Sequence, residues 1–219
     1  MNGNFSRTVF ILFLFISFTN NAQSTGPKSF YGGMFYAIDV IRSDAFQTIR
    51  KENGDLAAVD SLFISTLKYF EGDVSETLLA LTFATVPFNK IDFQIPLLKK
   101  IITIPLPSAQ KKIFDEKVTK SPKLLFPDSH LTGYGDKDKL AHFFGNAFIR
   151  YSFRLFNLSK FLGIFVEFME EGFFVNGEFN KKDILANHLG EFFAEALIKN
   201  PNSVPSGVFL IYQLLFIRI

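Results

Sequence analysis

Hydrophobic positions in the first half of the chain recur every three or four residues, the spacing of a helix that buries one face. Val59, Phe63 and Leu67 form one such run. Clusters rich in Gly, Asn, Asp and Pro interrupt the pattern, and Ser75 and Ser108 precede two of the runs in the position of helix N-caps. The pattern predicts helices at residues 34–51, 56–70, 76–86 and 109–119, the last of them polar and solvent-exposed.

Residues 91–95 alternate between apolar and polar side chains, which is the period of a strand. Pro96 follows, and residues 97–105 are again mostly apolar and end at Pro105. Proline cannot donate a backbone hydrogen bond, so these prolines favour edge strands over a central strand. We therefore predict two short strands or one extended segment near residues 91–105, in a protein that is otherwise mainly α and built as a small helical bundle.

In the second half, polar residues recur four positions apart on segments that are otherwise rich in Phe. They are Asp138, His142 and Asn146, then Glu167 and Glu171, then Asp183 and Asn187. A spacing of four places both members of a pair on the same face of a helix. The pattern predicts three packed helices, beginning near residues 136, 160 and 181, whose polar faces meet. The candidate site is Asp138, His142, Glu167, Asp183 and Asn187.

Each candidate residue also has a purely structural interpretation. Asp138 stands where an N-cap is common, and a histidine such as His142 often only completes a hydrogen-bond network. Asn187 carries more information, because Asn is a poor residue for a helix interior and needs a compensating contact. Near it runs a line of small residues that favours close packing of helices. These are Ala186, Gly190 and Ala194.

The N-terminus, residues 1–22, has the pattern of a secretory signal peptide. Arg7 supplies a positive charge, residues 9–18 are an apolar run, and Ala22 ends a short polar segment. We predict cleavage after Ala22 and export to the periplasm or cell envelope; the alternative is an uncleaved membrane anchor. The mature chain divides into a helical region at residues 23–120, a connector at 121–135 that contains Pro and Gly, and a helical domain at 136–219.

Composition narrows the possible functions. The chain has no Cys, which excludes disulfides, zinc–thiolate sites, a cysteine nucleophile and a lipid-modified lipoprotein. Its formal net charge is only +2 and no basic stripe stands out, so nucleic acid is not expected as a partner. The 30 Phe residues predict a thick aromatic core. The apolar residues 208–217 fit either a membrane contact or a buried last element. No cofactor is predicted.

The order of motifs in the second half resembles the VanZ-like family and the related YfiM-like envelope proteins. It is Asp138-Lys139-x-x-His142, then Glu167, then Asp183-x-x-x-Asn187-x-x-Gly190. The resemblance covers about a quarter of the chain, at residues 136–197, and implies a small α-helical, membrane-associated domain in the bacterial envelope. Charged residues such as Arg150 and Arg154 interrupt the runs that span the bilayer in VanZ-like proteins. We therefore expect peripheral contact with a membrane surface or an envelope lipid.

Three functions fit these patterns. The first is an exported, membrane-associated envelope protein with a structural or accessory role, in which the polar residues specify how the helices pack. The second is an envelope enzyme that acts on a lipid or a lipid-linked cell-wall precursor, with His142 as general acid or base oriented by Asp138. The third is a metal site formed by His142, Asp138, Glu167 and Asp183, an oxygen-rich set that suits Mg²⁺ or Mn²⁺ and, less often, Zn²⁺. We favour the first hypothesis and keep the second as its alternative.

Overall fold

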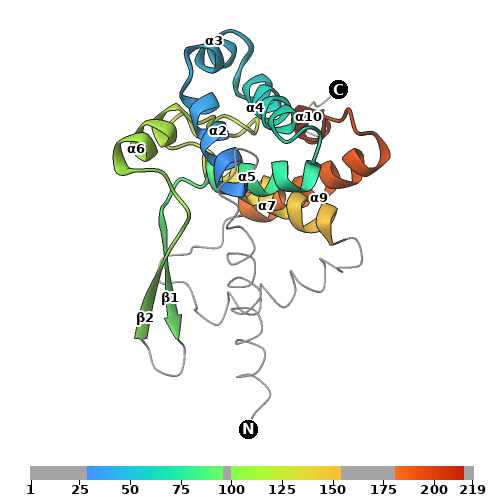
Figure 1. Ribbon diagram of the computed structural model, residues 1–219. Coiled ribbons are helices and arrows are strands. Elements are labelled where there is room, and N and C mark those ends of the chain that lie inside the picture. The colour runs from blue at the N-terminus through green and yellow to red at the C-terminus, as the bar shows by residue number, and fades with distance from the viewer. Residues whose placement is uncertain (1–28, 96–99, 154–180, 215–219) are drawn as a thin grey trace.

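The computed structural model describes residues 29–95, 100–153 and 181–214. Within these residues the chain is mainly helical and has a small sheet of two antiparallel strands, which confirms the fold class expected from the sequence (Figure 1). The helices pack into one body, and the two strands extend away from it. In chain order the elements are α2 (Phe30–Arg42), α3 (Asp44–Asn53), α4 (Asp55–Tyr69), α5 (Val74–Thr85), β1 (Lys90–Ile95), β2 (Lys100–Pro105), α6 (Lys111–Lys120), α7 (Lys139–Ser152), α9 (Lys181–Lys199) and α10 (Pro205–Leu214).

Ser43 divides residues 34–51, which were expected to form one helix, into α2 and α3. Its backbone is extended, with φ −67° and ψ 148°. The hydroxyl donates to the carbonyl of Val40 at 2.8 Å, and the same oxygen accepts from the amide of Phe46 at 3.2 Å. One serine thus ends α2 and caps α3, so the prediction of a single helix is wrong. The prediction for α4 is confirmed to within one residue at each end.

Helix α5 begins two residues earlier than expected because Asp73, and not Ser75, is its N-cap. Oδ1 of Asp73 accepts a hydrogen bond from the amide of Glu76 at 3.0 Å. The hydroxyl of Ser75 instead lies 2.5 Å from that of Ser152, at the end of α7. Asp and Ser are N-caps of similar quality, so local sequence alone did not decide between the two positions.

The core is aromatic, as the Phe content predicted. Phe143 of α7 stacks on Phe193 of α9 with ring centroids 5.4 Å apart, and Phe63 of α4 meets Phe193 edge-on at 5.1 Å. Phe209 of α10 joins them, 4.8 Å from Phe143. All four side chains are buried. Both regions distinguished in the sequence, residues 23–120 and 136–219, therefore contribute to this cluster, and the division into domains stays a prediction.

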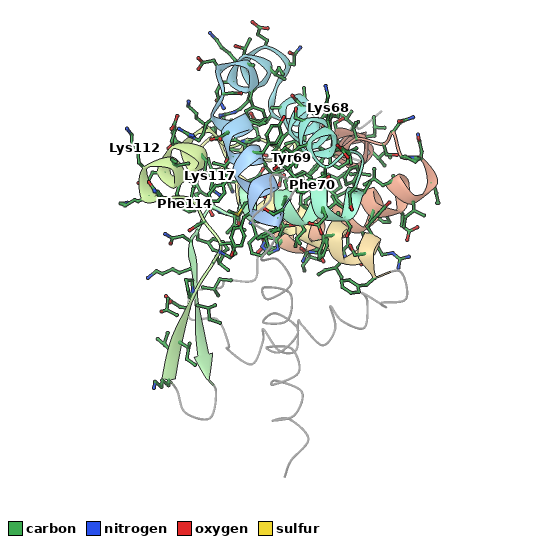
Figure 2. The ribbon with its side chains drawn as sticks, in the orientation of Figure 1. Lys68, Tyr69, Phe70, Lys112, Phe114 and Lys117 are labelled. Carbon is green, nitrogen blue, oxygen red and sulfur yellow. The ribbon has the colours of Figure 1, made fainter. Side chains whose placement is uncertain are left out.

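Helix α6 was expected to be a solvated surface helix, but Lys117 on it is only 1% exposed. Its ammonium donates to the carbonyl of Ala84 at 2.8 Å and to that of Val86, and it lies 4.9 Å from the ring centroid of Phe114 (Figure 2). These two carbonyls stand at the end of α5, where no further helical amide can reach them. Burial lowers the pKa of Lys117 to about 7, and an amine can donate to both carbonyls in either protonation state.

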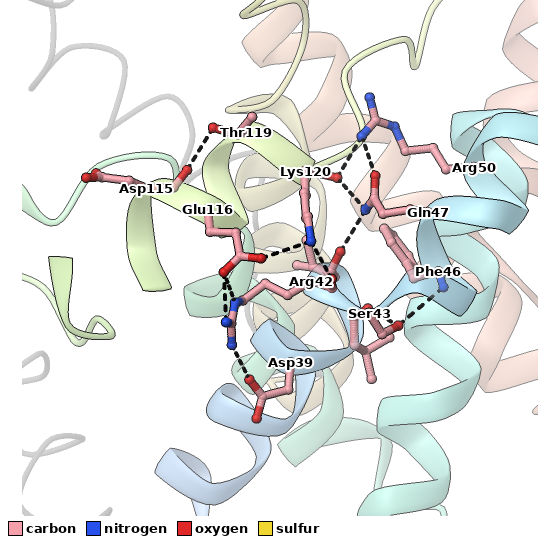
Figure 3. A network of polar contacts seen from close by, with 12 residues as sticks. Asp39, Arg42, Ser43, Phe46, Gln47, Arg50, Asp115, Glu116, Thr119 and Lys120 are labelled. Atoms are coloured by element: carbon pink, nitrogen blue, oxygen red, sulfur yellow. Dashed lines mark hydrogen bonds and ion pairs between the residues drawn. The ribbon is translucent and has the colours of Figure 1, made fainter. Parts of the chain in front are cut away.

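A network of charged groups joins α6 to α2 and α3 (Figure 3). Glu116 accepts from the guanidinium of Arg42 at 2.8 Å and from the ammonium of Lys120 at 2.9 Å. Hydrogen bonds from Lys120 and Arg42 hold the pKa of Glu116 below its ordinary value. Arg50 of α3 donates to the backbone carbonyl of Lys120 at 2.8 Å. Because solvent screens these charges, the network specifies how α6 sits against α2 more than it adds stability.

Two carboxylates fix the connector that leads into α7. Asp55 accepts from the amides of Lys123 and Leu124 at 2.6 and 2.7 Å. Asp136, which is 2% exposed, accepts from the amide of Leu125 at 3.3 Å and also bonds the hydroxyl of Ser129. The turn before Asp136 is tight: Gly135 has φ +57°, and a Cβ there would lie 2.4 Å from the carbonyl oxygen of Lys123. The start of α7 is therefore held in one position.

The apolar residues near the C-terminus form α10, which is buried on one side only. Val208 and Phe209 are in the core, whereas Leu210 and Ile211 are 50% and 66% exposed. Residues 208–217 were interpreted either as a membrane contact or as a buried last element. The second interpretation holds for Val208 and Phe209. None of the described helices combines the length and the apolar sequence that crossing a bilayer requires.

Candidate functional site

The candidate site lies where α7 and α9 pack against each other at very short distance. At Gly190 of α9 a Cβ would lie 2.2 Å from the carbonyl oxygen of Phe143 and 3.1 Å from the amide nitrogen of Ala147, both on α7. Ala186 and Ala194, one turn on either side, are fully buried. The line of small residues therefore lets the two helices approach to backbone contact, as its spacing predicted. Side chains that flank this contact on both helices are forced to meet.

Asn187 connects α9 to two residues of α7. Its Oδ1 lies 3.2 Å from Nδ1 of His142 and accepts from Nδ2 of Asn146 at 2.6 Å. The amide of Asn146 also donates to the carbonyl of His142 at 2.9 Å, which fixes its orientation. Because Oδ1 of Asn187 can only accept, it favours the tautomer of His142 that carries a proton on Nδ1. These contacts supply the compensation that an Asn inside a helix needs.

Lys139 is the cation at the centre of the cluster. Its ammonium lies 2.5 Å from Oδ2 of Asp138 and 2.5 Å from Oδ1 of Asp183, and its side chain is only 5% exposed. Burial lowers the pKa of Lys139, but hydrogen bonds and charge attraction from the two carboxylates outweigh this effect and raise the pKa above its ordinary value. Lys139 therefore stays charged and ties the start of α7 to the start of α9.

The carboxylates have further neighbours. Oδ1 of Asp183 lies 3.8 Å from Nε2 of His142, so both ring nitrogens face oxygen atoms. Oδ1 of Asp138 is buried and has no hydrogen-bond partner among the described residues. Tyr134 stands close by: burial raises its pKa to about 12, and the charges of Asp138 and Asp183 add to the effect.

Four of the five predicted site residues are brought together on α7 and α9, either directly or through Lys139. They are Asp138, His142, Asp183 and Asn187. Asp138 is at the N-cap position of α7, but its side chain makes no capping hydrogen bond and turns to Lys139 instead. Glu167 and the helix expected around it lie outside the described residues.

The candidate site predicted from the sequence did not include Lys139, Asn146 or Tyr134, although Asn146 was placed on the helix face of Asp138 and His142. For Lys139 a signal was available, because Lys139, His142 and Asn146 follow one another at three and four residues and so share one face of a helix. Tyr134 lies in the connector between Gly133 and Gly135, where no periodicity indicates which way a side chain points. Only the fold of the connector brings it near the two carboxylates.

Residues of α7 contact residues of α9 in the same order along both helices. Lys139 meets Asp183, His142 meets Asn187, and Arg150 donates to Glu195 at 2.7 Å. The two helices therefore run parallel, with ion pairs at both ends of the contact and Gly190 between them. Among the residues that the structure describes, no group of three or more His, Asp or Glu side chains is arranged to hold a metal ion.

Comparison of the chain with protein-family models, with curated proteins and with solved structures found no match. The resemblance to VanZ-like and YfiM-like proteins stays a prediction that rests on the motif residues.

Proposed function

We propose that this protein is an exported, membrane-associated protein of the bacterial envelope with a structural or accessory role. The position of Lys139 is the observation that supports a structural or accessory role. Its buried ammonium occupies the space between Asp138 and Asp183 at 2.5 Å from each, so the carboxylates have a cation within the protein. Such a cluster specifies which helices pair and in which register. The export part rests on Arg7, the apolar residues 9–18 and Ala22.

Fractionation of cells that make the protein tests its location. We expect the mature N-terminus at Gln23, and the protein in the membrane fraction, from which carbonate or high salt releases it. The physical reason is that charges interrupt the apolar runs of the mature chain, so attachment should be peripheral. N-terminal sequencing and immunoblots of washed membranes give the result. A chain that still begins at Met1, that stays in the cytosol, or that resists both washes would contradict the proposal.

One observation favours the alternative, an envelope enzyme that acts on a lipid or a lipid-linked cell-wall precursor. The side chain of His142 is 40% exposed, although its two nitrogens face Asn187 and Asp183. An imidazole that is oriented by an acceptor on one nitrogen and remains accessible to solvent has the arrangement of a general acid or base.

Replacing His142 with Gln separates the two functions. Gln keeps a donor for Oδ1 of Asn187 but cannot titrate, so we expect a stability loss under ~1 kcal/mol and an unchanged envelope phenotype. Unfolding curves, and complementation of a deletion strain, are the measurements. His188→Gln is the matched control, since His188 is exposed and bonds only Glu191 on its own helix among the described residues. A stable His142→Gln protein that fails to complement, beside a His188→Gln protein that succeeds, would favour the enzyme.

A further inference from the structure

Strands β1 and β2 form a hairpin that stands out from the helical body (Figure 1). The strands pair antiparallel from Lys90 opposite Pro105 to Ile95 opposite Lys100. Every residue of β2 is exposed. A two-stranded hairpin is marginally stable in water on its own, because it has no second layer to cover its apolar side chains.

The register sorts the residues of the hairpin onto two different faces. Ile91 stands opposite Ile104, and Ile102 lies two residues from Ile104 on the same strand; these three residues share one face because successive residues of a strand alternate. The other face has Asp92 opposite Thr103, and the Thr103 hydroxyl donates to Oδ1 of Asp92 at 2.5 Å. On the first face Ile102 and Ile104 are 42% and 37% exposed. One face of the hairpin is therefore apolar and exposed, whereas the other is mixed and also carries the exposed Ile101.

Positive charge accompanies this apolar face. Residues 90–105 contain three lysines and one aspartate. Lys100 is exposed and lies on the same face as Ile102, two residues along the strand, whereas Lys90 lies on the face of Asp92. An apolar surface that carries a lysine at one end matches an anionic bilayer, where apolar side chains enter the boundary of the acyl chains while the ammonium group stays with the phosphates.

We propose that the apolar face of the β1–β2 hairpin docks on the surface of an anionic phospholipid bilayer, with Lys100 at the headgroup phosphates. The inference rests on the membrane association of the proposed function and identifies the element responsible for it. The exposed apolar residues of α10 are a poorer candidate, because residues 205–214 contain no charged side chain.

A single tryptophan tests the hairpin directly, because the chain has no Trp of its own. The full chain carrying Ile102→Trp is mixed with vesicles of phosphatidylglycerol and phosphatidylethanolamine. We expect a blue shift of its fluorescence and at least twofold quenching by brominated lipid. Vesicles of phosphatidylcholine alone should give a response several-fold weaker. Ile211→Trp on α10 is the matched control, since Ile211 is also an exposed apolar residue, and its fluorescence should change little.

Three results would overturn the inference. The first is no response of Ile102→Trp to anionic vesicles, and the second is an equal response of Ile211→Trp. The third is a blue shift that depends on protein concentration without lipid, which would assign the face to a second copy. Should Ile102→Trp fold poorly, amide hydrogen exchange of the parent chain decides instead, because docking should protect the amides of residues 100–104 on vesicle addition.

Failure of this inference is distinguishable from failure of the proposed function. If the native protein fractionates with membranes but Ile102→Trp does not respond, the hairpin inference alone fails. If the native protein is absent from membranes while Ile102→Trp responds to vesicles, the hairpin binds lipid and the proposed location is wrong.

Discussion

Gly190→Ala should cost about 3 kcal/mol of folding free energy, because it forces α7 and α9 apart. A methyl group there would lie 2.2 Å from the carbonyl oxygen of Phe143, and a backbone oxygen inside a helix cannot swing aside as a side chain can. Separating the helices would also lengthen the contact of His142 with Asn187, now 3.2 Å. Urea unfolding monitored by circular dichroism measures the loss.

Gly207→Ala is the control for this prediction. Gly207 also lies within a helix, α10, but nothing stands within 4 Å of the position of its added Cβ. Alanine should therefore stabilise the protein there by about 0.5–1 kcal/mol, because it reduces the freedom of the unfolded chain. If Gly190→Ala behaved like Gly207→Ala, the close contact of α7 with α9 would be wrong.

Lys139→Met should cost about 3 kcal/mol at neutral pH, the usual loss when one partner of a buried ion pair is removed. The substitution leaves Asp138 and Asp183 facing each other without the cation that now lies 2.5 Å from both. This expected loss is at the low end of the range for buried pairs, because the side chains of Asp138 and Asp183 are 21% and 24% exposed. Unfolding curves of the parent and the variant give the difference.

The pH dependence identifies the cause of that loss. Because the folded pKa of Lys139 is raised above its ordinary value of 10.5, its stabilisation is complete below pH 10.5 and disappears as the pH rises through the folded pKa. The variant has no ammonium to lose, so its difference from the parent should shrink as the pH rises through that pKa. Adding Asp183→Asn to Lys139→Met should restore part of the stability at neutral pH.

Lys111→Met is the matched control, because Lys111 also pairs with an aspartate. Its ammonium lies 3.1 Å from Asp115, but the lysine side chain is 90% exposed. Solvent screening should limit the effect to about 0.5 kcal/mol. Equal losses for Lys111→Met and Lys139→Met would contradict the prediction that the buried ion pairs of Lys139 stabilise the fold more than an exposed pair does.

Local patterns were enough to predict elements whose signals lie within a few residues. The alternation at residues 91–95 identified β1, because a strand repeats every two residues whatever surrounds it. The spacing of four between Asp183 and Asn187 placed both on one face of α9, and the break at residues 200–202 ended that helix. Sequence also indicated that Gly190 serves a close contact, because small residues recur on the line through it.

Equal local signals left other features undecided until the tertiary structure supplied their partners. A helix could pass through Ser43, or Ser43 could cap a new one; the second occurs because Ser43 bonds both Val40 and Phe46. Asp73 and Ser75 are equally good N-caps on their own, and Ser75 is instead paired with Ser152, which is distant in sequence. Propensity ranks such choices weakly, and contacts across the fold override it.

By itself the sequence determined which residues of the candidate site share a helix face, because that depends only on the helical period. Which faces meet was decided by tertiary structure alone. Lys139 is forty-four positions from Asp183 along the chain, and no local spacing pairs them. Lys117 looks like a surface lysine among other charges, and only the end of α5 packed against it makes it a buried donor. Local periodicity sets the direction of a side chain, whereas its partners depend on how distant segments pack, since burial and charge pairing act between segments wherever they lie in the sequence.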